Sequence, residues 1–278
     1  MMTERATNAT EQVNHKQLPI GVFDSGIGGL TVLSVLRQMF PHEDFVYVGD
    51  NANNPVGNRP AEEINDIAIN IGRFLEKVPV KMAVVACNTF SVVSLDALQK
   101  TFDYPVVGMS KGVRTAIEIS PQKSIAVMAT AATIHSHKHK EEAAQLNPSI
   151  EIFEQACPEL AHLIEEGHLS DELITGLLRD YLAESTGVGT DTIILGCTHF
   201  PFLKSVMEQI TGPEVVYVDP SYETANEVKR ILEAKDLVNP KRTAGKLDIC
   251  FTKNIALAKR MTERLIPADA FTIREVTL

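Results

Sequence analysis

The chain has no tryptophan, only four cysteines, and neither a long apolar run nor a basic cluster. A membrane-spanning helix needs about eighteen consecutive apolar residues, which no segment provides, and the polar first eighteen residues lack the apolar core of a secretory signal. Proteins that bind the phosphate backbone of nucleic acids need clustered cations, whereas the formal net charge here is −10. We therefore expect a cytoplasmic protein that acts on a small molecule, with no membrane and no nucleic-acid partner.

The cysteines are widely spaced, at Cys87, Cys157, Cys197 and Cys250. A reducing cytoplasm keeps such thiols free, and without a Cys-x-x-Cys pair they predict neither zinc nor a redox centre. Cys157 precedes a proline and Cys250 lies inside an apolar segment, so we interpret both as inert small hydrophobic residues. Cys87 and Cys197 differ, because each follows an apolar run and precedes polar residues.

Three histidines, His135, His137 and His139, form a tract that looks like a metal site. On a helix, side chains two positions apart point about 200° away from each other, so only an extended chain would bring the three rings together. We therefore predict no metal site. No sequence signature calls for a nucleotide or for pyridoxal phosphate either.

A length of 278 residues with 44% hydrophobic residues is enough for about two α/β units, each with its own core. Short apolar segments alternate with stretches of helical periodicity. The expected strands are 19–23, 44–49, 83–86, 104–108, 124–129, 192–195, 215–218, 247–251 and 271–273. This alternation predicts parallel sheets, and the restart of the pattern at Ser124 suggests two related halves.

Cys87 comes directly after a predicted strand, at the start of Cys87-Asn88-Thr89. Cys197 follows another after a single glycine, at the start of Cys197-Thr198-His199. Parallel sheets bind ligands outside the carboxyl ends of their strands. Two such ends facing each other would place a thiol on either side of one small ligand. This arrangement inverts a stereocentre, because one thiolate removes the α-proton while the opposite thiol returns a proton from behind.

Polar residues near these thiols provide candidate binding groups. Ser25, Asn88, Thr89 and Thr198, with exposed backbone N–H groups, can hold the carboxylate and ammonium of an amino acid. The turn 24–29, Asp-Ser-Gly-Ile-Gly-Gly, adds N–H groups that favour an anion such as a carboxylate.

The ionisation of the thiols also needs assistance. A free thiol is only a few per cent ionised at neutral pH, so neighbouring groups must tune it. Asp24 and His199 are the candidates, by analogy with residues that orient or polarise a base elsewhere.

These motifs resemble the cofactor-independent glutamate racemases of the aspartate/glutamate racemase family. The matching segments are Asp24–Leu30, Val84–Thr89 and Leu195–Pro201, in the expected order. The resemblance implies two pseudo-symmetric parallel-sheet α/β domains with the active site in the cleft between them. The implied division is a flexible tail over 1–18, a first domain over 19–107 plus 220–278, and a second domain over 108–219.

The resemblance also implies the roles of individual residues and of partners. Cys87 and Cys197 would be the two bases, and Glu165 is similar to a helper carboxylate of the family. The implied substrate-binding residues are Asp24, Ser25, Val56, Gly57, Asn88, Thr89, Thr198 and His199. The family supplies D-glutamate for peptidoglycan without a cofactor, and a peptidoglycan precursor activates some members. Whether the protein forms a homodimer is left open.

Two positions depart from the usual family residues. Val56 stands where a tyrosine is usual, and Phe90 where a small residue is usual. Neither residue changes the proposed chemistry of the thiols. Together they leave undecided how long the side chain of the substrate is. The alternatives to a glutamate racemase are therefore an aspartate racemase of the same superfamily and a non-catalytic protein that binds an amino acid or inhibits a partner.

Overall fold

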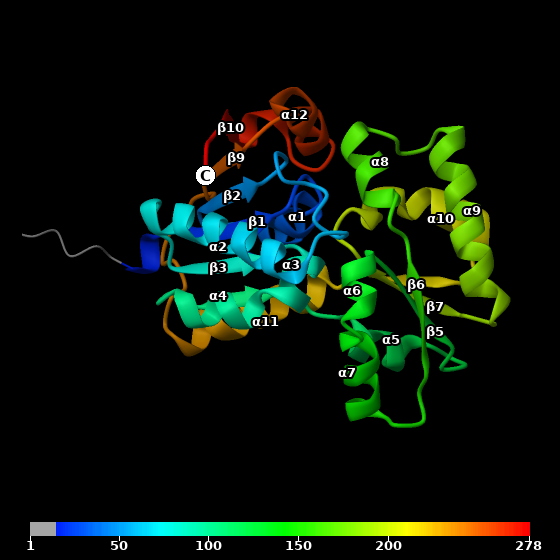
Figure 1. Ribbon diagram of the computed structural model, residues 1–278. Helices are drawn as coiled ribbons and strands as arrows, with labels where there is room; N and C mark the ends of the chain where they lie inside the picture. Colours follow the sequence, from blue (N-terminus) through cyan, green and yellow to red (C-terminus); the bar gives the residue numbers. More distant parts are fainter. Residues whose placement is uncertain (1–14) are drawn as a thin grey trace, which may run out of the picture.

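The computed structural model describes residues 15–278, so residues 1–14 of the expected N-terminal tail lie outside the described part. It contains two parallel sheets, each flanked by helices, and Figure 1 shows them side by side. The six-stranded sheet is built from residues near both ends of the described chain, and the four-stranded sheet from the middle. None of the helices within 15–278 is long and apolar enough to cross a membrane.

The strands are β1 (Ile20–Asp24), β2 (Phe45–Gly49), β3 (Met82–Val85), β4 (Val106–Gly108), β5 (Ile125–Ala129), β6 (Ile152–Ala156), β7 (Thr192–Gly196), β8 (Val216–Val218), β9 (Leu247–Phe251) and β10 (Thr272–Glu275). The α-helices are α1 (Leu30–Met39), α2 (Ala61–Lys77), α3 (Asn88–Val93), α4 (Leu95–Thr101), α5 (Val113–Ile119), α6 (Ala131–His135), α7 (Lys138–Leu146), α8 (Leu160–Glu166), α9 (Glu172–Gly187), α10 (Lys204–Thr211), α11 (Ser221–Ala234) and α12 (Ile255–Glu263). Short 3-10 helices cover His15–Gln17, Phe200–Leu203 and Ala268–Ala270.

The two sheets repeat one strand order. The first runs β10-β9-β2-β1-β3-β4 and the second β6-β5-β7-β8, so β2-β1-β3-β4 and β6-β5-β7-β8 are topologically equivalent. Every strand pair is parallel. This confirms the predicted α/β class with two related parallel sheets, in which β3 and β7 hold equivalent places.

The central strands are buried on both faces, and their sequences are accordingly apolar throughout. Residues of β1, β3 and β7 are all buried, because helices cover both sides of each sheet. The helix α2 shows the complementary pattern. It buries Ile64, Ile67, Ala68 and Ile71 on one stripe at helical spacing, and it carries acidic residues in its first turn, where the helix dipole favours them.

Among the strands within residues 15–278, β6 is the one that the sequence did not predict. Its segment Ile152–Ala156 contains Glu154 and Gln155, so it has no apolar run. It lies at an edge of its sheet, where Glu154 pairs with His137 and Lys140. Polar edge strands of this kind limit unwanted pairing and carry little sequence signal.

Two helical segments depart from a simple pattern. The chain after Cys87 does not form one continuous helix, because it is divided at Ser94 into α3 and α4. On α9, Ile174, Leu178 and Leu182 are buried, whereas Leu173 is 53% exposed.

After β8 the chain returns to the six-stranded sheet. The helix α11 packs against α1 and β4, and β9 then pairs with β2. The chain therefore crosses between the sheets twice, around 109–124 and around 219–220. The domain limits 19–107, 108–219 and 220–278 stay a prediction. They differ from the sheet membership at Gly108, which ends β4.

Candidate active site

A cavity lies between the two sheets, at the carboxyl ends of their strands. Cys87 follows β3 and Cys197 follows β7, so the two thiols leave equivalent strands of the two sheets. The residues lining the cavity are Ser25, Asn54, Pro55, Val56, Gly57, Asn58, Cys87, Asn88, Thr89, Thr130, Pro158, Ala161, Cys197, Thr198 and His199. Nine of the ten predicted site residues are among them, and Asp24 lies directly behind Thr198.

The cavity is nearly closed. Its volume available to the centre of a water-sized sphere is about 20 Å³, close to the roughly 10–15 Å³ that one water molecule requires. An amino acid is several times larger than a water molecule. The cavity as it stands is therefore too small to enclose an amino acid completely.

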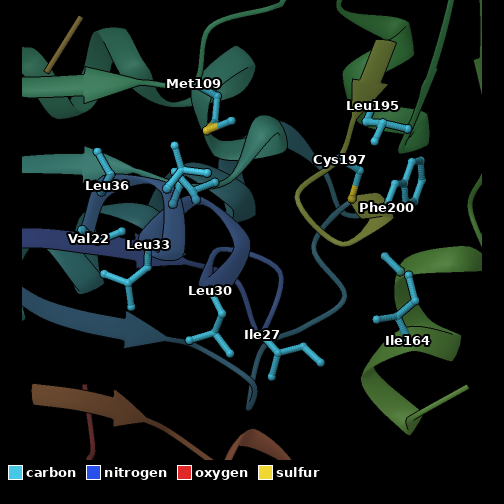
Figure 2. Packing of buried hydrophobic residues seen from close by; sticks show 14 of the residues in the cluster. Val22, Ile27, Leu30, Leu33, Leu36, Met109, Ile164, Leu195, Cys197 and Phe200 are labelled. Carbon is cyan, nitrogen blue, oxygen red and sulfur yellow. The ribbon is translucent and has the colours of Figure 1, made fainter. Parts of the chain in front are cut away.

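Figure 2 shows Cys197 in the loop after β7, beside Phe200, with Ile164 of α8 on the same side and Ile27, in the turn between β1 and α1, nearby. The Nδ1 atom of His199 lies 3.7 Å from the Cys197 sulfur, and Nε2 lies 2.7 Å from Glu165 Oε1. The hydrogen bonds from His199 to Cys197 and Glu165 outweigh burial and hold the pKa of His199 well above its usual value. The imidazolium gives a Cys197 thiolate a positive neighbour.

Cys87 has different surroundings. Its sulfur lies 3.8 Å from the Ser25 hydroxyl and the residue is 5% exposed. Burial raises the pKa of Cys87 far above its usual value, and the negative charge of Asp24 raises it further. In this closed form Cys87 is therefore a protonated thiol. The two sulfurs therefore differ in their surroundings, since Cys197 lies beside the His199 ring and Cys87 lies beside the Ser25 hydroxyl.

Asp24 is fully buried at the end of β1. Its carboxylate accepts hydrogen bonds from the Gly26 N–H at 2.7 Å and from the Thr198 hydroxyl at 2.9 Å. Burial raises the pKa of Asp24 from 3.8 to about 6, although the nearby charge of His199 lowers it. Asp24 therefore changes protonation near pH 6, in contact with the loop that carries Cys197. Its role in tuning proton transfer stays a prediction.

The raised pKa of Asp24 predicts a pH-dependent stability. Between about pH 4 and pH 6 the folded protein binds more protons at Asp24 than the unfolded chain, so stability falls as the pH rises through this window. The Asp24→Asn variant has no carboxyl group at this position, so it lacks this loss of stability. Relative to wild type, its free energy of unfolding should rise by about 2 kcal/mol between pH 4 and pH 7. This is most of the roughly 3 kcal/mol that 1.36 kcal/mol per pH unit gives for the whole shift from 3.8 to about 6. Urea unfolding of both proteins at the two pH values measures it.

Asp191 provides a control, because its effect on stability is expected to change with pH in the opposite direction. Hydrogen bonds from Ser120 and the Gln122 N–H outweigh the effect of burial and lower the pKa of Asp191. Asp191→Asn should therefore become less stable relative to wild type as the pH rises. If Asp24→Asn shows the same trend as Asp191→Asn, Asp24 is not the group that becomes protonated near pH 6.

The glycine-rich turn has a different role from the expected one. Its N–H groups were expected to favour a ligand anion, but the Gly26 N–H bonds Asp24 and the Ile27 N–H bonds Glu165 Oε1 at 2.7 Å. A Cβ atom on Gly26 would lie 1.9 Å from Glu165 Oε1, and one on Gly28 would lie 2.5 Å from His199 Nδ1. The glycines therefore let the side chains of the opposite sheet approach the turn.

Six of the lining residues were not predicted from the sequence, and Asn54 and Thr130 are among them. The Asn54 amide nitrogen and the Asn88 amide oxygen are buried without a hydrogen-bond partner, which suits them to a polar ligand. The Thr130 hydroxyl lies 2.9 Å from that of Thr89, across the two sheets. Thr130 could have been predicted from the sequence, because it is a polar residue that comes directly after the strand β5.

The two residues that depart from the family pattern occupy different places. Val56 is 2% exposed and lines the cavity. Phe90 is fully buried in the same apolar cluster, with its ring centroid 6.2 Å from that of Phe23, and it does not line the cavity. Phe90 therefore fills the core, and Val56 is the one of the two that faces a ligand.

The remaining cysteines and the histidine tract lie outside the cavity lining. Cys157 and Cys250 are buried. His139 is buried in α7, while His137 pairs with Glu154 at the surface, so the tract does not converge. Across residues 15–278, no three His, Cys, Asp or Glu side chains are grouped so that they could hold a metal ion.

A model of the Asp/Glu/Hydantoin racemase family matches residues 30–228, which is more than half of the chain. The chain belongs to this family. Among its racemase relatives, the glutamate racemase of Herpetosiphon aurantiacus is 40% identical over 233 residues, covering 84% of this chain and 92% of the relative.

Solved structures of the racemase family extend the similarity to the fold. Glutamate racemase isoform RacE1 from Bacillus anthracis matches with a TM-score of 0.85 and 33% identity over 95% of this chain and 99% of that one. The Escherichia coli glutamate racemase, in complex with L-glutamate and the activator UDP-MurNAc-ala, matches with a TM-score of 0.78 and 27% identity over 93% and 97%. The resemblance seen in the motifs is confirmed.

Proposed function

We propose that the chain is a glutamate racemase that interconverts L- and D-glutamate through a thiolate and a thiol. The observation that carries the proposal is the placement of Cys87 and Cys197 on equivalent strands of two sheets, lining one cavity. A single proton carrier would return its proton to the same face of the α-carbon. Two carriers on opposite sides give inversion.

The proposed reaction balances protons without an outside reagent. The Cys197 thiolate, beside the His199 imidazolium, removes the α-proton and becomes a thiol, which leaves an electron pair on the α-carbon. The Cys87 thiol then gives its proton to the opposite face and becomes a thiolate. The reverse direction uses the opposite ionisation states.

Two polar groups support an amino-acid substrate. The unpartnered Asn88 oxygen is placed to accept from the ammonium group, and the unpartnered Asn54 nitrogen is placed to donate to a carboxylate. The similarity to glutamate racemases favours glutamate over aspartate. A misfit of one methylene changes kcat/KM by about 10- to 200-fold, which makes the distinction measurable.

Circular dichroism of L-glutamate and L-aspartate, each incubated with the dialysed protein, tests this function. The circular dichroism signal of L-glutamate should decay to zero, and kcat/KM should be larger for L-glutamate than for L-aspartate. A larger kcat/KM on aspartate would move the function to aspartate racemase. Absence of turnover on both amino acids would favour the non-catalytic alternative.

Activity is expected to survive chelators and carbonyl-trapping reagents and to be abolished by thiol alkylation. In the proposed reaction the thiols carry the protons, whereas pyridoxal chemistry needs a Schiff-base lysine and metal chemistry a bound ion. The measurement is racemisation after dialysis against EDTA, after hydroxylamine, and after iodoacetamide. Loss of activity with EDTA that zinc or manganese restores would overturn this part of the mechanism.

The cellular role follows from the same proposal. The enzyme would supply D-glutamate for peptidoglycan in the cytoplasm, where its thiols stay reduced. The Escherichia coli relative was solved with the activator UDP-MurNAc-ala, which supports a similar response here. Turnover with and without this compound tests the response.

A further inference from the structure

The hydroxyl of Tyr47 contacts the glycine-rich turn from inside the six-stranded sheet. Tyr47 lies in the middle of β2 and is fully buried, with its ring packed against Phe251 at a centroid distance of 5.6 Å. Its hydroxyl donates to the Gly26 carbonyl oxygen at 2.6 Å. Burial raises the pKa of Tyr47 well above its usual value, and nearby negative groups raise it further, so the hydroxyl keeps its proton.

The Gly26 carbonyl belongs to the peptide bond between Gly26 and Ile27. The N–H of the same peptide, on Ile27, donates to Glu165 Oε1 at 2.7 Å. Tyr47 and Glu165 therefore hold one peptide group from its two ends. Hydrogen bonds at the two ends of a peptide polarise each other, so a donor on the oxygen strengthens the bond that the N–H makes.

The chain of contacts continues to a thiol. Glu165 Oε1 also lies 2.7 Å from His199 Nε2, and His199 Nδ1 lies 3.7 Å from the Cys197 sulfur. We propose that Tyr47 is a positioning residue for the Cys197 side of the proton transfer, acting through the peptide 26–27, Glu165 and His199. This inference rests on the proposed racemase function.

The backbone around the turn leaves room for this contact. A Cβ atom on Gly29 would lie 2.9 Å from the Tyr47 hydroxyl, and one on Gly49 would lie 2.7 Å from the Gly26 carbonyl oxygen. Both distances are shorter than real Cβ contacts, so larger residues at these positions would disturb the bond. The glycines on both sides thus admit the tyrosine hydroxyl as well as the side chains of the opposite sheet.

The test is Tyr47→Phe, which removes the hydroxyl and keeps the ring. We expect kcat for glutamate to fall about three- to tenfold, the range that one neutral hydrogen bond supplies, with KM changed less than about twofold. Tyr104→Phe is the matched control, because the Tyr104 hydroxyl also donates to a glycine carbonyl, that of Gly72, at 3.0 Å and away from the cavity. It should leave kcat unchanged.

A second measurement separates positioning from a general loss of structure. Tyr47→Phe is combined with Cys87→Ala in one double variant and with Cys197→Ala in another. In deuterated water, only Cys197 can exchange the α-hydrogen in the first double variant, and only Cys87 can do so in the second. Exchange by Cys197 should fall by the same three- to tenfold factor, while exchange by Cys87 should change less than about twofold. Equal losses on the two sides, or no loss on the Cys197 side, would overturn the inference. If wild type does not racemise glutamate, the proposed function fails first and the inference falls with it.

Discussion

Cys87→Ala is expected to stop racemisation in both directions and still to exchange the α-hydrogen of one isomer with solvent. Each direction needs one thiolate and one thiol, so removing either sulfur lowers kcat by about 10⁴-fold, the upper end for a positioned acid or base. The remaining Cys197 thiolate can still remove a proton from its own side and return one with retention. If Cys197 faces the α-hydrogen of the L isomer, as the family resemblance implies, Cys87→Ala exchanges L-glutamate and leaves D-glutamate untouched.

Proton NMR in deuterated water measures this exchange, and circular dichroism measures racemisation. Cys197→Ala should show the reverse preference for the isomers. The exchange should be slow, because residues that act as a unit do not contribute additively. Cys157→Ala and Cys250→Ala are matched controls, since both thiols are buried outside the cavity lining and should leave turnover unchanged. Racemisation by either active-site variant at a rate near wild type would show that its sulfur is structural.

Gly28→Ala is expected to lower kcat/KM for glutamate about 10²- to 10³-fold in a folded protein. A Cβ atom there would lie 2.5 Å from both His199 Nδ1 and the Thr198 hydroxyl, so the two loops could not close as they do. His199 would then lose its place beside Cys197, and Thr198 its bond to Asp24. Misplacing groups by about 1 Å costs on the order of 10²-fold in rate. Steady-state kinetics and a thermal melt measure the effect.

Gly176→Ala is the control for this substitution. Gly176 lies within α9, and an added Cβ atom would meet nothing within 4 Å. Because alanine favours a helix over glycine, this variant should gain up to about 1 kcal/mol in stability with unchanged kcat/KM. Wild-type turnover by Gly28→Ala would mean that catalysis does not need the close contact of His199 with the turn.

The features that the sequence predicted best are those with a local signal. Strands such as β3 and β7 are continuous apolar runs because both faces are covered, and each ends in a cysteine followed by polar residues. Parallel topology then places these strand ends at one edge of each sheet. Local pattern and one topological rule were therefore enough to place each thiol at the ligand-binding edge of its own sheet, whereas the cleft between the two sheets came from the family resemblance.

The contacts that the sequence did not reveal are non-local. The Ile27 N–H bonds Glu165, 138 residues away, and the Thr198 hydroxyl bonds Asp24, 174 residues away. No spacing rule connects such positions, so the turn was expected to favour a ligand anion when in fact it binds carboxylates of the protein itself. Asn54 was missed for the same reason, because only the folded loop shows that its amide is buried and unpartnered.

The late position of β9 in the chain has a consequence for synthesis on the ribosome. β9 pairs with β2, and the loop after it holds the loop after β2 through bonds from the Thr252 hydroxyl to Asp50 and from the Asn51 amide to the Lys253 carbonyl. A nascent chain that has reached residue 246 already carries both thiols, yet it lacks the strand that fixes this wall of the cavity. Such a chain leaves one edge of β2 exposed to other strands. This wall of the cavity is therefore completed only after β9 has been made, even though both thiols are made earlier.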